Sequence, residues 1–104
     1  MFVAVAFSVQ VDSAKAAAVG AWTPYSSEIT PEASEVFEEA LDGLVGVSYT
    51  PVAFATQIVS GTNYSFFCNA KVVYPNAPNE AAIVDIYQPL GEKAQIQDIQ
   101  PIRH

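Results

Sequence analysis

Cysteine and histidine are the side chains of this sequence that most readily suggest covalent chemistry, and each occurs once, as Cys68 and His104. A nucleophilic thiol needs a base held within hydrogen-bonding distance, and no pattern in the sequence places His104 beside Cys68. Cys68 instead belongs to an alternating, apolar-rich run, which is typical of a buried and unreactive thiol. We therefore expect no cysteine-based catalysis. A lone cysteine also excludes an intramolecular disulfide.

Carboxylates and aromatic rings are the other groups with catalytic or binding potential. Four carboxylates have the spacing of a solvated helix face: Glu35, Glu38, Glu39 and Asp42. Asp85 and Asp98 fall on different predicted strands, and the sequence alone does not pair them. Trp22 and Tyr25 are interpreted as packing residues rather than as contacts to a sugar or peptide. Calcium loops, phosphate-binding loops and nucleotide fingerprints are absent from the sequence. We expect neither an enzyme nor a bound cofactor or metal.

The composition indicates one folded, acidic domain. The chain has 104 residues, of which 51% are hydrophobic and 14% charged, and this argues against disorder. Eleven Asp and Glu residues against four Lys and Arg residues give a net charge of −7. A nucleic-acid partner needs a basic stripe to displace counterions from phosphates, and none exists here. Anionic membrane surfaces are disfavoured for the same reason.

The first 18 residues have two interpretations. Phe2–Val11 is an apolar run too short to span a bilayer, and small residues follow it as in an export signal. No Lys or Arg precedes the run, however, and its β-branched and aromatic residues equally suit an extra strand. A secreted or periplasmic location is favoured over a cytoplasmic one. If the run is retained, a homodimer through this strand edge is a hypothesis.

A helix is predicted over Thr30–Leu44. Thr30 suits the N-cap because its hydroxyl can accept from a free N–H of the first turn, and proline is tolerated at the next position, Pro31. Apolar residues recur on one helical face: Ala33, Val36, Phe37, Ala40, Leu41 and Leu44. Gly43 and Gly46 supply the stop.

After the helix, the apolar pattern changes to a period of two, which predicts strands. The expected strands are Tyr49–Ser60, Tyr64–Tyr74, Ala81–Gln88 and Ala94–Ile99. Short turns join them, so the predicted sheet is a meander with one face free for the helix to cover. The expected fold is α+β, with one N-terminal helix packed on a four- to five-stranded antiparallel sheet.

The first turn of this predicted sheet carries a recognisable motif. Gln57–Gly61 reads Gln-Ile-Val-Ser-Gly and continues Thr-Asn-Tyr. This resembles the Gln-x-Val-x-Gly hairpin of the cystatins, which are reversible inhibitors of papain-like cysteine proteases, and most closely the disulfide-free stefin branch. Ile29–Glu32 resembles the helix start of that family, and Tyr87–Gly91 resembles its second hairpin. The resemblance extends over Val19–Ile102 and implies a cystatin-like domain over residues 19–104.

In that family, an N-terminal trunk and two hairpins form a wedge that binds across the catalytic cysteine without presenting a cleavable bond. The resemblance implies these protease-binding residues: Val19, Gly20, Gln57, Ile58, Val59, Ser60, Gly61, Pro89 and Leu90. Val59 and Gly61 would make the central contact, Gln57 would shape the turn, and Gly20 would be the hinge of the trunk. The implied partner is a papain-like cysteine protease, and the implied function is reversible inhibition by occlusion.

Two departures from the family pattern keep a second interpretation open. Pro89 and Leu90 reverse the Leu-Pro order of the stefins, and Gly20 is followed by Ala21 rather than by a second glycine. Either change is compatible with a cystatin-like binding or structural module, exported or periplasmic, that has no inhibitory activity, because a fold does not imply a function.

Overall fold

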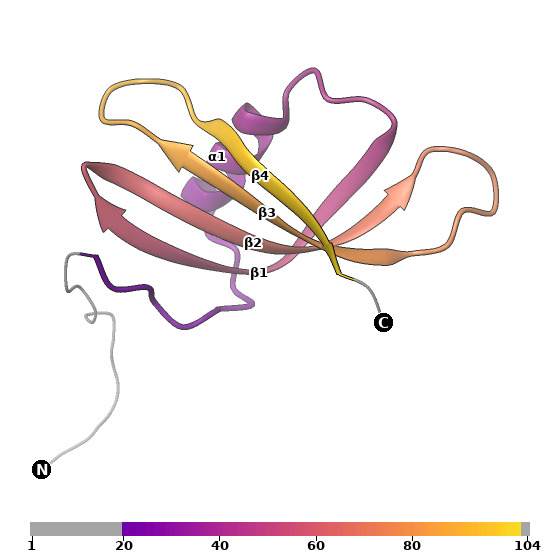
Figure 1. The fold of residues 1–104 in the computed structure, drawn as a ribbon, viewed down its shortest axis with the longest axis horizontal. Coiled ribbons are helices and arrows are strands. Elements are labelled where there is room, and N and C mark those ends of the chain that lie inside the picture. Colours follow the sequence, from indigo (N-terminus) through magenta and orange to yellow (C-terminus); the bar gives the residue numbers. More distant parts are fainter. Residues whose placement is uncertain (1–19, 103–104) are drawn as a thin grey trace, which may run out of the picture.

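The computed structural model describes residues 20–102, so the interpretations placed on residues 1–18 and the predicted contact at Val19 lie outside the described part. Helix α1 (Pro31–Leu41) is followed by strands β1 (Val47–Val59), β2 (Gly61–Val72), β3 (Glu80–Gln88) and β4 (Gln95–Ile102). The strands form one antiparallel sheet in the order β1-β2-β3-β4, and α1 crosses one of its faces (Figure 1). The predicted α+β architecture is confirmed.

Helix α1 begins where the sequence predicts. Thr30 has an extended backbone, and its hydroxyl accepts a hydrogen bond from the Ala33 N–H at 3.1 Å, while Pro31 is the first helical residue. The helix ends at Leu41, three residues earlier than predicted, because Asp42 leaves helical geometry and Gly43 has a φ of +86°. The assignment of Leu44 to the buried helix face is therefore wrong, and its side chain is 44% exposed.

The core fills the space between α1 and the face of the sheet that the helix covers, here called the inner face. Phe66 of β2 is fully buried, and its ring lies 4.9 Å from that of Phe37 at an interplanar angle of 65°. This edge-to-face arrangement is favourable for aromatic rings. The remaining buried members of the core are Ala33, Val36, Tyr64, Cys68, Val84, Ile86 and Ala94. The helix face and the period-two alternation of β2 predict the inward positions on α1 and β2, whereas those on β3 and at Ala94 were not assigned from the sequence.

The strand boundaries differ from the predicted ones by at most three residues. β1 starts at Val47 and contains Pro51, next to a register shift between Pro51 and Ala53. Proline is tolerated there because the bulge interrupts the hydrogen-bond ladder, so no backbone N–H donor is required at this position. β2 begins directly at Gly61 and ends at Val72, so Tyr74 is not part of the strand and is 56% exposed.

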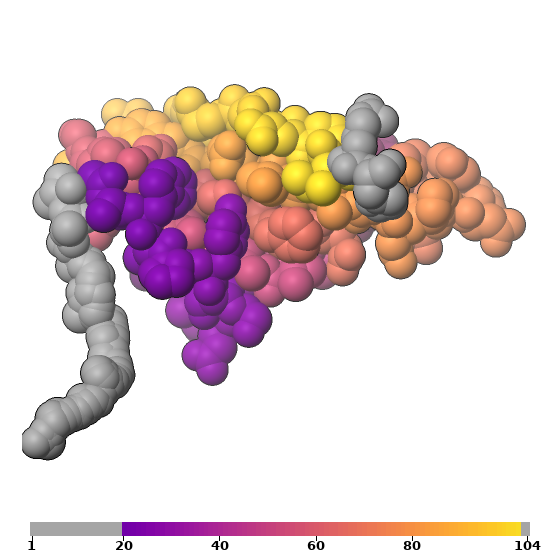
Figure 2. All heavy atoms as spheres, turned by 60° about the horizontal axis from the view of Figure 1, so that its bottom comes forward, coloured from indigo at the N-terminus to yellow at the C-terminus, as the bar shows by residue number. Residues whose placement is uncertain are grey.

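The residues ahead of the helix, Gly20–Ser26, are here called the trunk. They run antiparallel to β1 and form an incomplete fifth strand at the sheet edge. The Ser26 and Phe54 backbones exchange two hydrogen bonds of 2.8 and 2.9 Å, and the Thr23 N–H donates to the Thr56 carbonyl at 2.9 Å. In Figure 2 this indigo segment lies along the side of the sheet turned towards the viewer.

Candidate functional site

Three segments that are distant in the sequence meet at one end of the sheet. The β1–β2 turn at Ser60, the loop between β3 and β4, and the start of the trunk all lie at the left of Figure 1. The antiparallel topology requires the first two to share an end, and the trunk joins them because the Gly20 N–H donates to the Ile58 carbonyl at 2.8 Å. We call this end of the molecule the wedge edge. The structure thus brings together all the described residues of the predicted protease-binding set.

Gln57 links the trunk to the first hairpin. Its Nε2 atom donates to the Gly20 carbonyl at 2.9 Å, and its Oε1 atom accepts from the Asn63 Nδ2 atom at 2.8 Å. Gln57 and Asn63 are direct cross-strand partners, so the backbone register places the two amides together. Both ends of the Gln57 amide are therefore used to fix the turn and the trunk relative to each other.

The two hairpins are in direct contact. The Tyr87 hydroxyl donates to the carbonyl of Ser60, the one residue between β1 and β2. Gly61 is buried under the second hairpin with a φ of +103°, and a Cβ atom there would lie 2.5 Å from the Gln88 carbonyl oxygen. Glycine therefore satisfies two requirements at this position, a positive φ and a close backbone approach. Its predicted contact with a protease stays a prediction.

The second hairpin is also fixed from the other side of the molecule. The Glu39 Oε1 atom of α1 accepts a hydrogen bond from the Ala94 backbone N–H at 2.9 Å. Ala94 is buried, so its N–H needs such a partner. Glu39 is exposed, in agreement with the predicted solvated helix face, and in addition it makes this one contact. Its carboxylate connects the helix to the loop that contains Pro89 and Leu90.

The predicted contact residues of the wedge edge are apolar or uncharged, whereas Glu92 and Lys93 further along the β3–β4 loop are charged and exposed. Ile58, Val59 and Leu90 are 48, 38 and 77% exposed, whereas Pro89 and Gln57 are only partly exposed. None of these five residues carries a charge, although the chain as a whole has a net charge of −7. An exposed apolar edge on an acidic molecule is the kind of surface that marks an interaction site.

Two residues that organise this edge stand in the quoted motifs but were given no role from the sequence. Asn63 and Tyr87 are cross-strand partners on the face opposite the helix, here called the outer face, in the same row as Gln57. Their roles depend on strand register, which sequence spacing alone does not fix. One signal in the sequence could have identified them: both are polar or hydroxyl-bearing residues at the outward-facing strand positions nearest the turns.

Cys68 is not placed to act as a nucleophile. Cys68 is completely buried in the core, and burial raises the pKa of its thiol to about 12. The thiolate, which is the reactive form, is therefore strongly disfavoured. His104 lies outside the described part of the chain. Across residues 20–102, no three His, Cys, Asp or Glu side chains lie together as a metal site requires, and no helix there is long and apolar enough to cross a membrane.

Comparison with known proteins adds no assignment to these observations. No protein-family model, no curated protein and no solved structure matches the chain. The resemblance to the cystatins therefore rests on the quoted motifs.

Proposed function

We propose that this chain is a reversible inhibitor of papain-like cysteine proteases, built on a cystatin-like scaffold. The observation that carries the proposal is the convergence of the trunk, the Gln57–Gly61 hairpin and the Pro89–Leu90 loop at one edge. The motifs place the family's wedge in these same three segments. The wedge edge would insert into the protease cleft and block it.

The bonds within the wedge edge support binding without cleavage. The Ser60 carbonyl is held by Tyr87, and Gly61 has a positive φ, so the turn cannot adopt the extended form of a protease substrate without breaking these contacts. The side chains of Ile58, Val59 and Leu90 supply the exposed apolar area. Because the three segments are already fixed to one another, little conformational entropy is lost when they bind.

Titration of papain activity with the purified chain tests this proposal. The parent is expected to inhibit reversibly at micromolar concentration or below. Val59→Asp places a charge at the centre of the apolar edge, where its desolvation costs several kcal/mol, so we expect inhibition to weaken about a hundredfold or more.

Val73→Asp is the matched control for Val59→Asp. Val73 is 70% exposed and lies just beyond β2, at the opposite end of the sheet, so this variant should inhibit like the parent. If the two variants inhibit papain equally, the wedge edge does not make the inhibitory contact. A folded parent that leaves papain fully active would overturn the proposal and favour a binding module without inhibitory activity.

A further inference from the structure

The outer face of the sheet carries a groove that the wedge edge does not use. It has a volume of about 530 Å³, within the range of small-ligand sites, and lies between the trunk and the strands. Its floor is formed by Ala55 and Ser65, whose side chains are short, with the backbone of β2 and β3 beneath. Trp22 and Tyr25 of the trunk form its wall and are 48 and 51% exposed. Both rings therefore keep much of their surface free.

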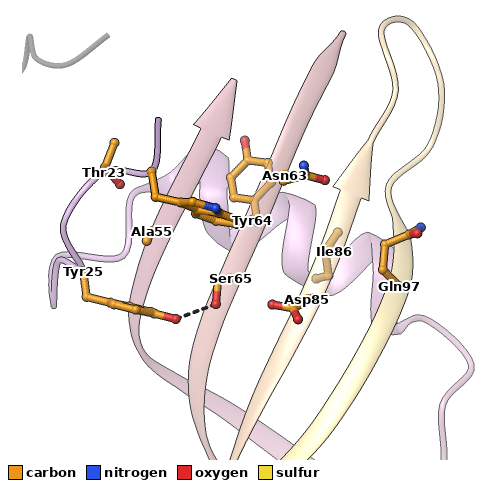
Figure 3. Close-up of a pocket in the computed structure, with 10 residues that line it drawn as sticks. Thr23, Tyr25, Ala55, Asn63, Tyr64, Ser65, Asp85, Ile86 and Gln97 are labelled. Atoms are coloured by element: carbon orange, nitrogen blue, oxygen red, sulfur yellow. Dashed lines mark hydrogen bonds between the residues drawn. The ribbon is translucent and has the colours of Figure 1, made fainter. Parts of the chain in front are cut away.

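Polar side chains from the trunk, β2, β3 and β4 line the groove. Figure 3 shows Tyr25, Ser65 and Asp85 side by side, with the Tyr25 and Ser65 hydroxyls hydrogen-bonded and Gln97 at the β4 side. Asp85 is the one charged residue among those that line the groove. No lysine or arginine is among the residues that line it.

The negative charge beside the groove is not neutralised within the sheet. Asp85 and Asp98 are direct cross-strand partners of β3 and β4, and like charges in that position repel. The pKa of Asp85 is raised, first by burial and also by Asp98, while the Ser65 hydrogen bond acts in the opposite direction. A cation in the groove would relieve the repulsion, and the faces of Trp22 and Tyr25 would attract the same cation through their ring quadrupoles.

We infer that this groove binds an alkylammonium group, held between the Asp85 carboxylate and the exposed rings of Trp22 and Tyr25. The ammonium belongs either to a free polyamine or to a lysine side chain of another protein, which present the same chemistry. The inference does not depend on protease inhibition. The groove lies on the outer face, and of its polar residues only Asn63 also takes part in the wedge edge, whereas Asp85, Trp22 and Tyr25 do not.

Intrinsic fluorescence of the full chain tests the inference directly, because Trp22 is the only tryptophan in the sequence. Titration with spermidine, at constant ionic strength, should change the emission saturably. A short neutral-ended lysine peptide distinguishes the sources: tighter binding of the peptide assigns the groove to a protein lysine, and tighter binding of spermidine assigns it to a polyamine. Saturable binding of maltose with no response to either amine would overturn the inference in favour of a sugar site.

Asp85→Asn removes the charge while keeping the shape of the side chain, and it should weaken amine binding at least tenfold. Glu80→Gln removes an exposed carboxylate elsewhere on β3 and is the control for general attraction to an acidic protein. Equal weakening in both variants, or no saturable response in the folded parent, would refute the site. Unfolding curves show that each variant is folded, and removal of a repulsive charge should not destabilise Asp85→Asn.

Discussion

Gly61 is the residue at which a single added carbon atom is expected to have the largest effect on the wedge edge. In Gly61→Ala, the new Cβ atom would meet the Gln88 carbonyl oxygen at 2.5 Å, and the residue would have to keep a φ of +103°. We expect a loss of about 3 kcal/mol in the free energy of unfolding, from the unfavourable φ and the forced separation of the hairpins. Urea unfolding measures this loss.

Gly43→Ala is the matched control for that prediction. Gly43 also has a positive φ, of +86°, but a Cβ atom there would have no neighbour within 4 Å. Only the conformational penalty of the positive φ applies, so we expect the free energy of unfolding to fall by about 1 kcal/mol. If the two variants lose the same stability, the close approach of the hairpins makes no energetic contribution and the packing argument fails.

The raised pKa of Asp85 makes the free energy of unfolding depend on pH, and the direction of that dependence can be derived. Its pKa is raised in the folded state by burial and by Asp98, so the folded chain holds the Asp85 proton more tightly than the unfolded chain does. The destabilising contribution of this carboxylate is therefore fully present above the folded pKa and disappears as the pH falls through the interval between the folded and unfolded values.

The variant Asp85→Asn tests that sign. It should be more stable than the parent at pH 7, by roughly 0.5 kcal/mol, because one like-charge cross-strand pair is removed. The difference should shrink towards zero as the pH is lowered through the Asp85 pKa. Thermal unfolding of both proteins over this range measures it. A difference that grows at acidic pH would mean that the Ser65 hydrogen bond outweighs burial and repulsion.

At the scale of elements, the carboxylate of Glu39 connects the helix to the second hairpin. In Glu39→Ala the buried Ala94 N–H loses its partner, which was bonded at 2.9 Å. Hydrogen bonds to a charged acceptor contribute more than neutral ones, so we expect a loss of about 2 kcal/mol. Amide hydrogen exchange at Ala94 should also become much faster.

Glu38→Ala is the corresponding control, because Glu38 is exposed on the same helix. Helix propensity and charge change equally in the two variants, so their difference isolates the contact with Ala94. If exchange at Ala94 is the same in both, Glu39 does not hold the loop.

The elements were predictable where a local pattern dictates them. The Thr30 cap, Pro31 and the spacing of Ala33, Val36 and Phe37 identify the helix start and its buried face without tertiary information. The early helix end was not predicted, because Leu44 continues the apolar spacing while Asp42 and Gly43 adopt non-helical backbone conformations. Strand limits were missed because pairing across the sheet, rather than local propensity, decides where β1 and β2 begin.

At the scale of the whole molecule, the sequence predicts the wedge edge but not its internal bonds. Hairpin order in an antiparallel meander requires the two turns to share an end. The contact of Tyr87 with Ser60, and the link from Gln57 to Gly20, depend on register and side-chain geometry. The outer groove was likewise not predicted, since it requires Trp22 to lie over strands that are 30 or more residues away in the sequence.

The trunk is held in place by bonds that should also affect the proposed protease contact. Its outermost bond, from the Gly20 N–H to Ile58, is supported by the Gln57 side chain on the Gly20 carbonyl. In Gln57→Ala we expect this end of the trunk to open more often. A loss of about 1 kcal/mol in the free energy of local opening corresponds to exchange of the Gly20 amide that is about fivefold faster. The Ser26 amide, bonded to Phe54 further along, should keep its exchange rate.

Gln95→Ala is the control for that change, because it removes the same side chain from β4 and leaves the trunk contacts intact. Inhibition of papain should weaken only in Gln57→Ala, since a trunk that is partly detached must be ordered again on binding. Faster Gly20 exchange with unchanged inhibition would show that the trunk is held by Gln57 but does not contribute to the protease contact. Unchanged Gly20 exchange would mean that backbone pairing with β1 alone holds the trunk in place.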